Sequence, residues 1–134
     1  MTKRVSWGLA TLTAITATMV VSSATYASGD AYISAATSCF ASASTPWYRS
    51  PSVHATGHIY CATVTDIEID VVLTRDGAEV DSAETAAAAP QLSATAIANN
   101  QSGNQKWCTL VTGRYYSGGN TYPLHDSACE SAAW

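Results

Sequence analysis

Basic side chains are scarce in this sequence. Six of its 134 residues are lysine or arginine, against ten acidic residues. Proteins that bind nucleic acid or anionic membrane surfaces use clustered lysine and arginine, and beyond Lys3 and Arg4 the chain has no such cluster. The composition therefore argues against both classes of partner. Little lysine beside abundant alanine, threonine, serine and glycine is also typical of a GC-rich bacterial genome.

Large aliphatic side chains are also few. Hydrophobic residues make up 47% of the chain, but much of that fraction is alanine, which buries little apolar area. Beyond the N-terminal segment the large aliphatics are Val53, Val64, Val71, Val72, Val80, Val111, Ile33, Ile59, Ile67, Ile69, Ile97, Leu73, Leu92, Leu110 and Leu124. A core this thin argues against a large multidomain enzyme and against a nucleotide-binding α/β fold.

Recognisable catalytic motifs are missing. The chain contains neither a G-x-S-x-G nucleophile turn nor an H-E-x-x-H metalloprotease helix. His125, Asp126 and Ser127 supply the letters of a catalytic triad. Triad members converge from separate chain segments, however, and neighbouring residues cannot reach one another in the required order. The sequence therefore predicts a protein that is not an enzyme and that has no cofactor.

Patterns that could hold a metal are equally weak. No C-x-x-C pair occurs. His54 and His58 would share one face of a strand about 13 Å apart, too far for a single ion. Asp66, Glu68 and Asp70 place three carboxylates on one strand face, but calcium needs six or more oxygens and a wrapping loop, which the sequence lacks. We therefore predict no metal site and interpret the carboxylates as a solvated strand face.

The N-terminus has the order of a secretory signal. Lys3 and Arg4 precede an uncharged, mostly apolar stretch at residues 9–21, and small residues follow up to Ala27. As a helix the stretch would reach only about 20 Å, short of the roughly 30 Å of a membrane core. We predict a signal peptide at residues 1–27, cleaved after Ala27 or alternatively after Ala24, and one secreted domain at residues 28–134. Two basic residues leave with the signal, so four remain against ten acidic residues, a net charge of −6.

Four cysteines, all in the predicted domain, suggest a disulfide framework, as is usual for a short exported chain. Three pairings are possible. We favour Cys39 with Cys61 and Cys108 with Cys129, because each pair closes a loop of about 20 residues, which should stabilise the fold by about 3 kcal/mol per bridge. With so few large aliphatics, both bridges are expected to be required.

Strand patterns dominate the predicted domain. Residues 67–73 alternate, with the aliphatic side chains on one face and Glu68 and Asp70 on the other. A turn at residues 75–77 returns the chain, and residues 106–116 form another strand, with Trp107, Thr109 and Val111 on one face and Cys108, Leu110 and Thr112 on the other. Further strand candidates are residues 57–64, 78–82, 92–98 and 121–124, with turns at 99–104 and 117–120. Only residues 83–90 look helix-like. We predict an all-β, antiparallel β-sandwich or small barrel held by two disulfides.

Aromatic residues beside arginine are the most informative feature for function. Trp47, Tyr48 and Arg49 lie within the first proposed disulfide loop, and Arg114, Tyr115 and Tyr116 lead into the glycine turn of the second. Such residues on bridged loops are typical of protein-binding hot spots. Tryptophan and tyrosine also stack on sugar rings. Alternatively, Trp47 or Tyr48 closes the end of the core.

The first half of the predicted domain resembles the small secreted bacterial α-amylase inhibitors of the tendamistat type. The shared order is Cys39, the Trp47-Tyr48-Arg49 loop, Cys61-Ala62-Thr63-Val64 and the alternating strand at residues 67–73. The triplet order differs from the family's Trp-Arg-Tyr, and residues 83–104 have no counterpart. The resemblance implies a two-bridge β-sandwich whose Trp47, Tyr48 and Arg49 enter an enzyme's cleft as a rigid plug.

These features predict a secreted, non-enzymatic binding protein whose partner is another protein, for instance a hydrolase such as α-amylase. Two other functions stay open. One is a carbohydrate or cell-wall binding module that uses Trp47, Tyr115 or Tyr116 for stacking. The other is a small adaptor subunit of a secreted multi-protein assembly.

Overall fold

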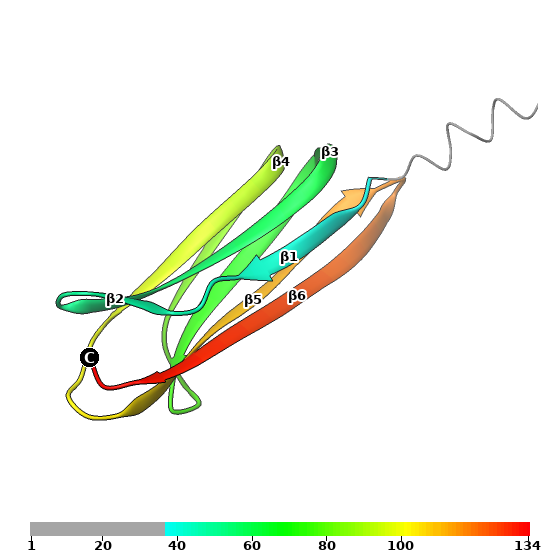
Figure 1. Cartoon of the computed structure of the whole chain (residues 1–134). Helices are drawn as coiled ribbons and strands as arrows, with labels where there is room; N and C mark the ends of the chain where they lie inside the picture. Colours follow the sequence, from blue (N-terminus) through cyan, green and yellow to red (C-terminus); the bar gives the residue numbers. More distant parts are fainter. Residues whose placement is uncertain (1–36) are drawn as a thin grey trace, which may run out of the picture. The chain divides into compact units, whose positions relative to one another are not determined.

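The computed structural model describes residues 37–134, which form antiparallel β-strands with no helix among them (Figure 1). The strands are β1 (Cys39–Ala43), β2 (Trp47–Arg49), β3 (Ser52–Arg75), β4 (Ala78–Asn99), β5 (Gln105–Ser117) and β6 (Asn120–Ala132). The predicted all-β antiparallel class is confirmed. The predicted signal peptide lies outside the described residues. Within residues 37–134 no helix is both long enough and apolar enough to cross a membrane.

The long strand β3 organises the sheet. β4 pairs with it along nearly its whole length, from Ser52 opposite Asn99 to Arg75 opposite Ala78. On its other edge, β1 and β2 pair with the first part of β3, and β5 pairs with the last part. β6 then pairs with β5. The sheet order is therefore β1-β3-β5-β6, with β2 and β4 also joined to β3.

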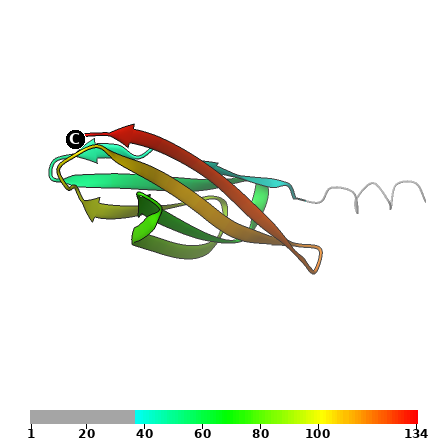
Figure 2. The same ribbon diagram turned by 90° about the horizontal axis from the view of Figure 1, so that it is seen from below.

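The sheet curls so that the two parts of β3 face each other (Figure 2). The pairing of β3 with β4 is irregular between Tyr60 and Thr65, where the strand bends. Gly57 in the first part then packs on the second: a Cβ atom at Gly57 would lie 2.6 Å from Val71 Cγ2 and 2.5 Å from Val111 Cγ2. Glycine therefore permits the close approach of the two halves.

The core lies between these two halves. As predicted, Ile67, Ile69, Val71 and Leu73 share one face, and they are buried together. On β5 the buried face is the one that carries Trp107, Thr109 and Val111. The first half of the sheet contributes Val53, Ala55, Ile59 and Ala96. Alternation along β3 thus places one side-chain set inside and the other in solvent, as a half-buried strand requires.

Both predicted glycine turns are present. Asp76 and Gly77 have φ values of 51° and 85°, and Gly118 and Gly119 have φ values of 58° and 79°. Positive φ at both central residues is the geometry of a tight two-residue hairpin, which asparagine, aspartate and glycine tolerate best. These turns join β3 to β4 and β5 to β6.

The helix-like interpretation of residues 83–90 is wrong. This segment belongs to β4, and its alanines pair with the second part of β3, as in Ala86 opposite Glu68 and Ala88 opposite Asp66. A run of eight residues that ends in Pro90 is too short to hold a helix alone, so pairing with β3 outweighs the helical preference of alanine.

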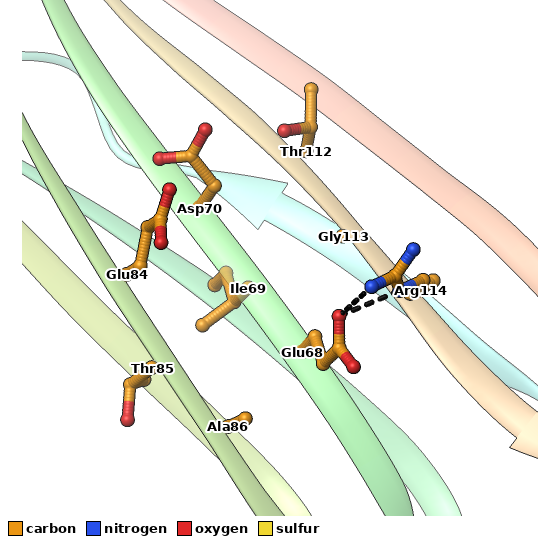
Figure 3. A pocket seen from close by; sticks show the side chains of 9 residues that line it. All are labelled: Glu68, Ile69, Asp70, Glu84, Thr85, Ala86, Thr112, Gly113 and Arg114. Atoms are coloured by element: carbon orange, nitrogen blue, oxygen red, sulfur yellow. Dashed lines mark hydrogen bonds and ion pairs between the residues drawn. The ribbon is translucent and has the colours of Figure 1, made fainter.

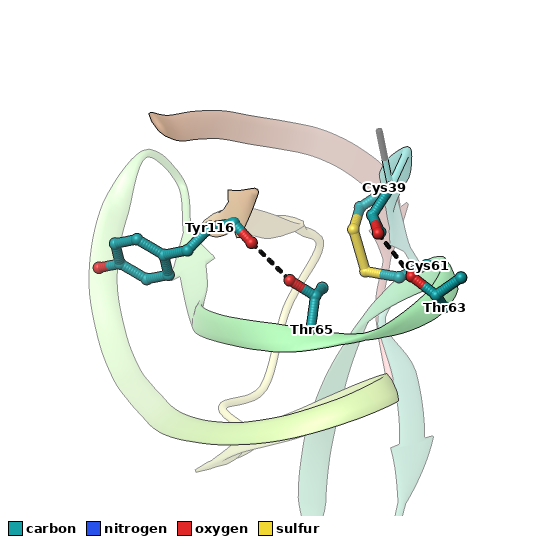
Figure 4. The surroundings of a disulfide bond; sticks show 6 residues. Cys39, Cys61, Thr63, Thr65 and Tyr116 are labelled. Atoms are coloured by element: carbon teal, nitrogen blue, oxygen red, sulfur yellow. Dashed lines mark hydrogen bonds between the residues drawn. A yellow bond between two sulfur atoms is a disulfide. The ribbon is translucent and has the colours of Figure 1, made fainter. Parts of the chain in front are cut away.

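The two favoured disulfides are confirmed. Cys39 bonds to Cys61 and Cys108 to Cys129, with Cα atoms 4.1 and 4.0 Å apart. Each bridge joins residues directly opposite in neighbouring strands. Near the first bridge, the Thr65 hydroxyl donates to the Tyr116 carbonyl oxygen at 2.5 Å (Figure 4). Two formed disulfides are consistent with an oxidising compartment.

Two aspartates link strands across the open sides of the curled sheet. The main-chain amide of Ala43 in β1 donates to Asp126 Oδ2 of β6 at 2.7 Å. The amide of Ile97 near the end of β4 donates to Asp81 Oδ2, near the beginning of the same strand, at 2.7 Å. These amides point away from β3, so each carboxylate occupies an edge position that another strand could otherwise pair with.

Candidate binding surface

Trp47, Tyr48 and Arg49 form β2, which pairs with Ser52–His54 in a short hairpin. All three are exposed, with exposed fractions of 43% for Trp47 and 38% for Tyr48. Neither ring therefore fills the core. The hairpin presents an indole, a phenol and a guanidinium at one end of the domain.

Aromatic contacts hold this hairpin in place. The Trp47 ring stacks on His54, with centroids 4.2 Å apart and planes 12° apart. Tyr48 lies parallel to Trp134 with centroids 6.0 Å apart. Asn100 fixes Trp134 in turn, because its Nδ2 donates to the Trp134 main-chain oxygen at 2.5 Å. We call Trp47, Tyr48, Arg49 and Trp134 the β2 end.

The second predicted cluster lies at the opposite end of the domain. Tyr115 pairs with Ile67, near the bend of β3, whereas Arg49 pairs with Ser52 at the start of β3. Figures 1 and 2 both show β2 at one end and the β5–β6 turn at the other. The number of residues between the two clusters did not indicate that they lie at opposite ends. A single small partner would therefore not touch both clusters.

Arg114 and Tyr116 are engaged within the domain. Arg114 forms an ion pair with Glu68, and the Tyr116 hydroxyl donates to Glu68 Oε1 at 2.9 Å. The hydrogen bond from Tyr116 and the one from Arg114 lower the pKa of Glu68. Tyr115 points elsewhere and stacks on Tyr122, with centroids 4.9 Å apart. Arg49, by contrast, has no ion pair within residues 37–134, so its charge is available to a partner.

A hollow of about 620 Å³ lies on the outer face of β3, β4 and β5 (Figure 3). Its wall contains Arg114 with Glu68, and also the facing carboxylates Asp70 and Glu84, which are register partners. Burial and then the neighbouring charges of Glu84 and Glu79 raise the pKa of Asp70. Asp70 Oδ1 has no hydrogen-bond partner within the described structure.

This arrangement predicts that Asp70→Asn stabilises the fold. Because the pKa of Asp70 is higher in the folded chain, the ionised carboxylate lowers the free energy of unfolding above that pKa. Below the ordinary aspartate pKa the effect disappears, since both states are then protonated. We expect a gain of about 0.5 kcal/mol at pH 7, or roughly 2–4 °C in Tm.

Thermal unfolding at pH 7 and pH 3 measures this effect. Asp66→Asn is the matched control, because Asp66 faces Ala88 rather than a carboxylate, and it should leave Tm unchanged. A lower Tm for Asp70→Asn at pH 7 would show that the Asp70 carboxylate is stabilising.

The remaining sequence candidates do not gather into a site. No group of three metal-ligating side chains occurs within residues 37–134. His54 and His58 lie on the same face of β3 and contact different rings, Trp47 and Tyr60. Asp126 accepts the Ala43 amide, a structural contact. Phe40 and Trp134 were not among the predicted site residues, because their partners come from distant segments.

The sequence was compared with protein-family models, curated proteins and solved structures. No family model, curated protein or solved structure matches this sequence.

Proposed function

We propose that this protein is a secreted, non-enzymatic binding protein that engages another protein through the β2 end. The observation that carries the proposal is the exposure of Trp47, Tyr48 and Arg49 together on an ordered hairpin. Tryptophan, tyrosine and arginine are the residues most enriched at binding hot spots. Their contacts with His54 and Trp134 hold them before binding, which reduces the entropy lost on association.

A hydrolase such as α-amylase is the partner that the resemblance to tendamistat-type inhibitors supports. In this proposal Trp47, Tyr48 and Arg49 form the plug that enters the enzyme's cleft. A hydrolase cleft lined with catalytic carboxylates suits Arg49, which has no internal ion pair in the described part of the chain. Charge attraction of this kind would also speed association.

Alanine variants at the β2 end test the proposal. Trp47→Ala and Arg49→Ala should each weaken capture of the partner about 30-fold or more, because a hot-spot side chain contributes about 2 kcal/mol or more. The measurement is capture from culture medium by the immobilised protein, followed by mass spectrometry. Both side chains are exposed, so circular dichroism should show an unchanged fold.

Arg114→Ala is the matched control for charge. Its guanidinium is bound to Glu68 at the other end of the domain, so capture should persist. If Trp47→Ala and Arg49→Ala capture the same proteins as the original chain, the β2 end is not the binding surface.

A further inference from the structure

Five rings gather on the outer side of the sheet half formed by β1, β2, the first part of β3 and the end of β4. This outer aromatic face consists of Phe40, Trp47, His54, His58 and Tyr60. Phe40 packs against Tyr60 with centroids 5.3 Å apart, and His58 stacks on Tyr60 at 5.6 Å. Trp47 stacks on His54 at 4.2 Å. The rings thus form two groups along one strand face.

The outer aromatic face is not part of the core. Val53, Ala55 and Ile59, which alternate with its members along β3, are fully buried on the opposite side. Phe40 is 61% exposed, and Ile97, the register partner of His54, is 47% exposed. Phe40 and Ile97 are therefore open to solvent, whereas His54, His58 and Tyr60 are half-buried. Exposed apolar area of this kind marks an interaction surface.

The charges beside the outer aromatic face indicate which kind of ligand it could bind. Residues 37–134 contain nine acidic and four basic residues, yet the register neighbours of these rings outside the face are Ser42, Ser93, Gln91 and Ile97. Thr95 lies between Ser93 and Ile97 on the same face of β4, opposite Thr56. Arg49 lies only in the next row of the sheet, opposite Ser52. Arg49 could pair with an anion at one end of the face, but along the rows of His58 and Tyr60 a charged ligand would lose hydration without gaining a partner. The face therefore suits a neutral ligand that offers apolar surface and hydroxyl groups.

We propose that the outer aromatic face binds a neutral, extended polysaccharide of the β-1,4-linked type, such as cellulose or chitin. Equatorial substituents leave the C–H faces of such sugar rings apolar, and these faces stack on aromatic rings. The serine, threonine and glutamine side chains beside them can hydrogen-bond the sugar hydroxyls. His54 and His58 are about 13 Å apart along the strand, a span that exceeds one sugar ring and calls for a chain. This site shares Trp47 with the β2 end, but its ligand and its other four rings differ, so each proposal can fail without the other.

Depletion binding to microcrystalline cellulose and to chitin tests the site, using the purified protein with its disulfides intact. The protein should be retained on at least one of them. Phe40→Ala combined with Tyr60→Ala should weaken retention about tenfold or more, since two stacking contacts are lost. Phe40→Tyr should retain binding. Tyr122→Ala removes an aromatic ring that is 37% exposed on the other sheet half and should have no effect.

The outcomes separate this site from the β2 end. Arg49→Ala should lose protein capture and keep polysaccharide retention, whereas Phe40→Ala should do the reverse. The proposal is overturned if neither polysaccharide retains the protein, or if Phe40→Ala with Tyr60→Ala is folded and retained like the original. Loss of protein capture alone in Phe40→Ala would identify the face as a protein contact instead and would also overturn it.

Discussion

Replacing Gly113 by alanine should destabilise the domain by about 3 kcal/mol, and replacing it by valine should prevent folding. A Cβ atom at this position would lie 2.5 Å from the Glu68 carbonyl oxygen and 2.5 Å from Ile59 Cδ1. The Ile59 side chain could turn away, but the Glu68 oxygen belongs to the paired strand β3. Relief of the clash therefore requires β5 to separate from β3, which breaks the pairing of Gly113 with Ile69.

Urea unfolding of Gly113→Ala beside Thr112→Ala measures this effect. Thr112 precedes Gly113 on the same strand and is exposed, so its replacement should change the free energy of unfolding by about 0.5 kcal/mol or less. A Gly113→Ala variant as stable as the Thr112→Ala control would show that β5 does not approach β3 as closely as described.

Removing both disulfides should leave the chain unfolded at 37 °C. The bridges span 22 and 21 residues, and each is expected to contribute about 3 kcal/mol by restricting the unfolded chain. Their joint contribution approaches the whole stability of a small domain, about 5–15 kcal/mol. The scarcity of large aliphatics in the core makes this dependence stronger.

Circular dichroism of three variants tests this dependence: Cys39→Ser with Cys61→Ser, Cys108→Ser with Cys129→Ser, and all four replacements together. Each single-bridge variant should unfold at lower urea than the original, and the fourfold variant should show no cooperative transition. A cooperative transition near that of the original chain in the fourfold variant would mean that the core alone suffices.

Local patterns in the sequence predicted the features that depend on neighbouring residues. The alternation at residues 67–73 shows the inner face directly, and Asp76-Gly77 and Gly118-Gly119 mark turns that need positive φ. The pairing of Cys39 with Cys61 followed from the loop it closes. The helix-like reading of residues 83–90 failed because local propensity competes with strand pairing, which the sequence does not display.

The candidate surfaces could be predicted only in part, because they too depend on strand pairing between distant segments. Trp47, Tyr48 and Arg49 are adjacent in sequence, so one strand holds them at the same end of the domain, with Tyr48 on the face opposite to Trp47 and Arg49. Phe40 meets Tyr60 only through the register of β1 with β3. The separation of Arg49 from Arg114 depends on where β3 bends. The alternation of His54, His58 and Tyr60 along one strand was the signal that could have indicated the outer aromatic face.

The most direct test of the β2 end is titration of α-amylase activity with the purified protein and with the double variant Trp47→Ala, Arg49→Ala. We expect the original chain to inhibit the enzyme, and we expect the double variant to be folded and to require a concentration at least about 30-fold higher for the same inhibition. Equal inhibition by both proteins, or none by the original chain, would contradict the proposed inhibitory role of Trp47 and Arg49.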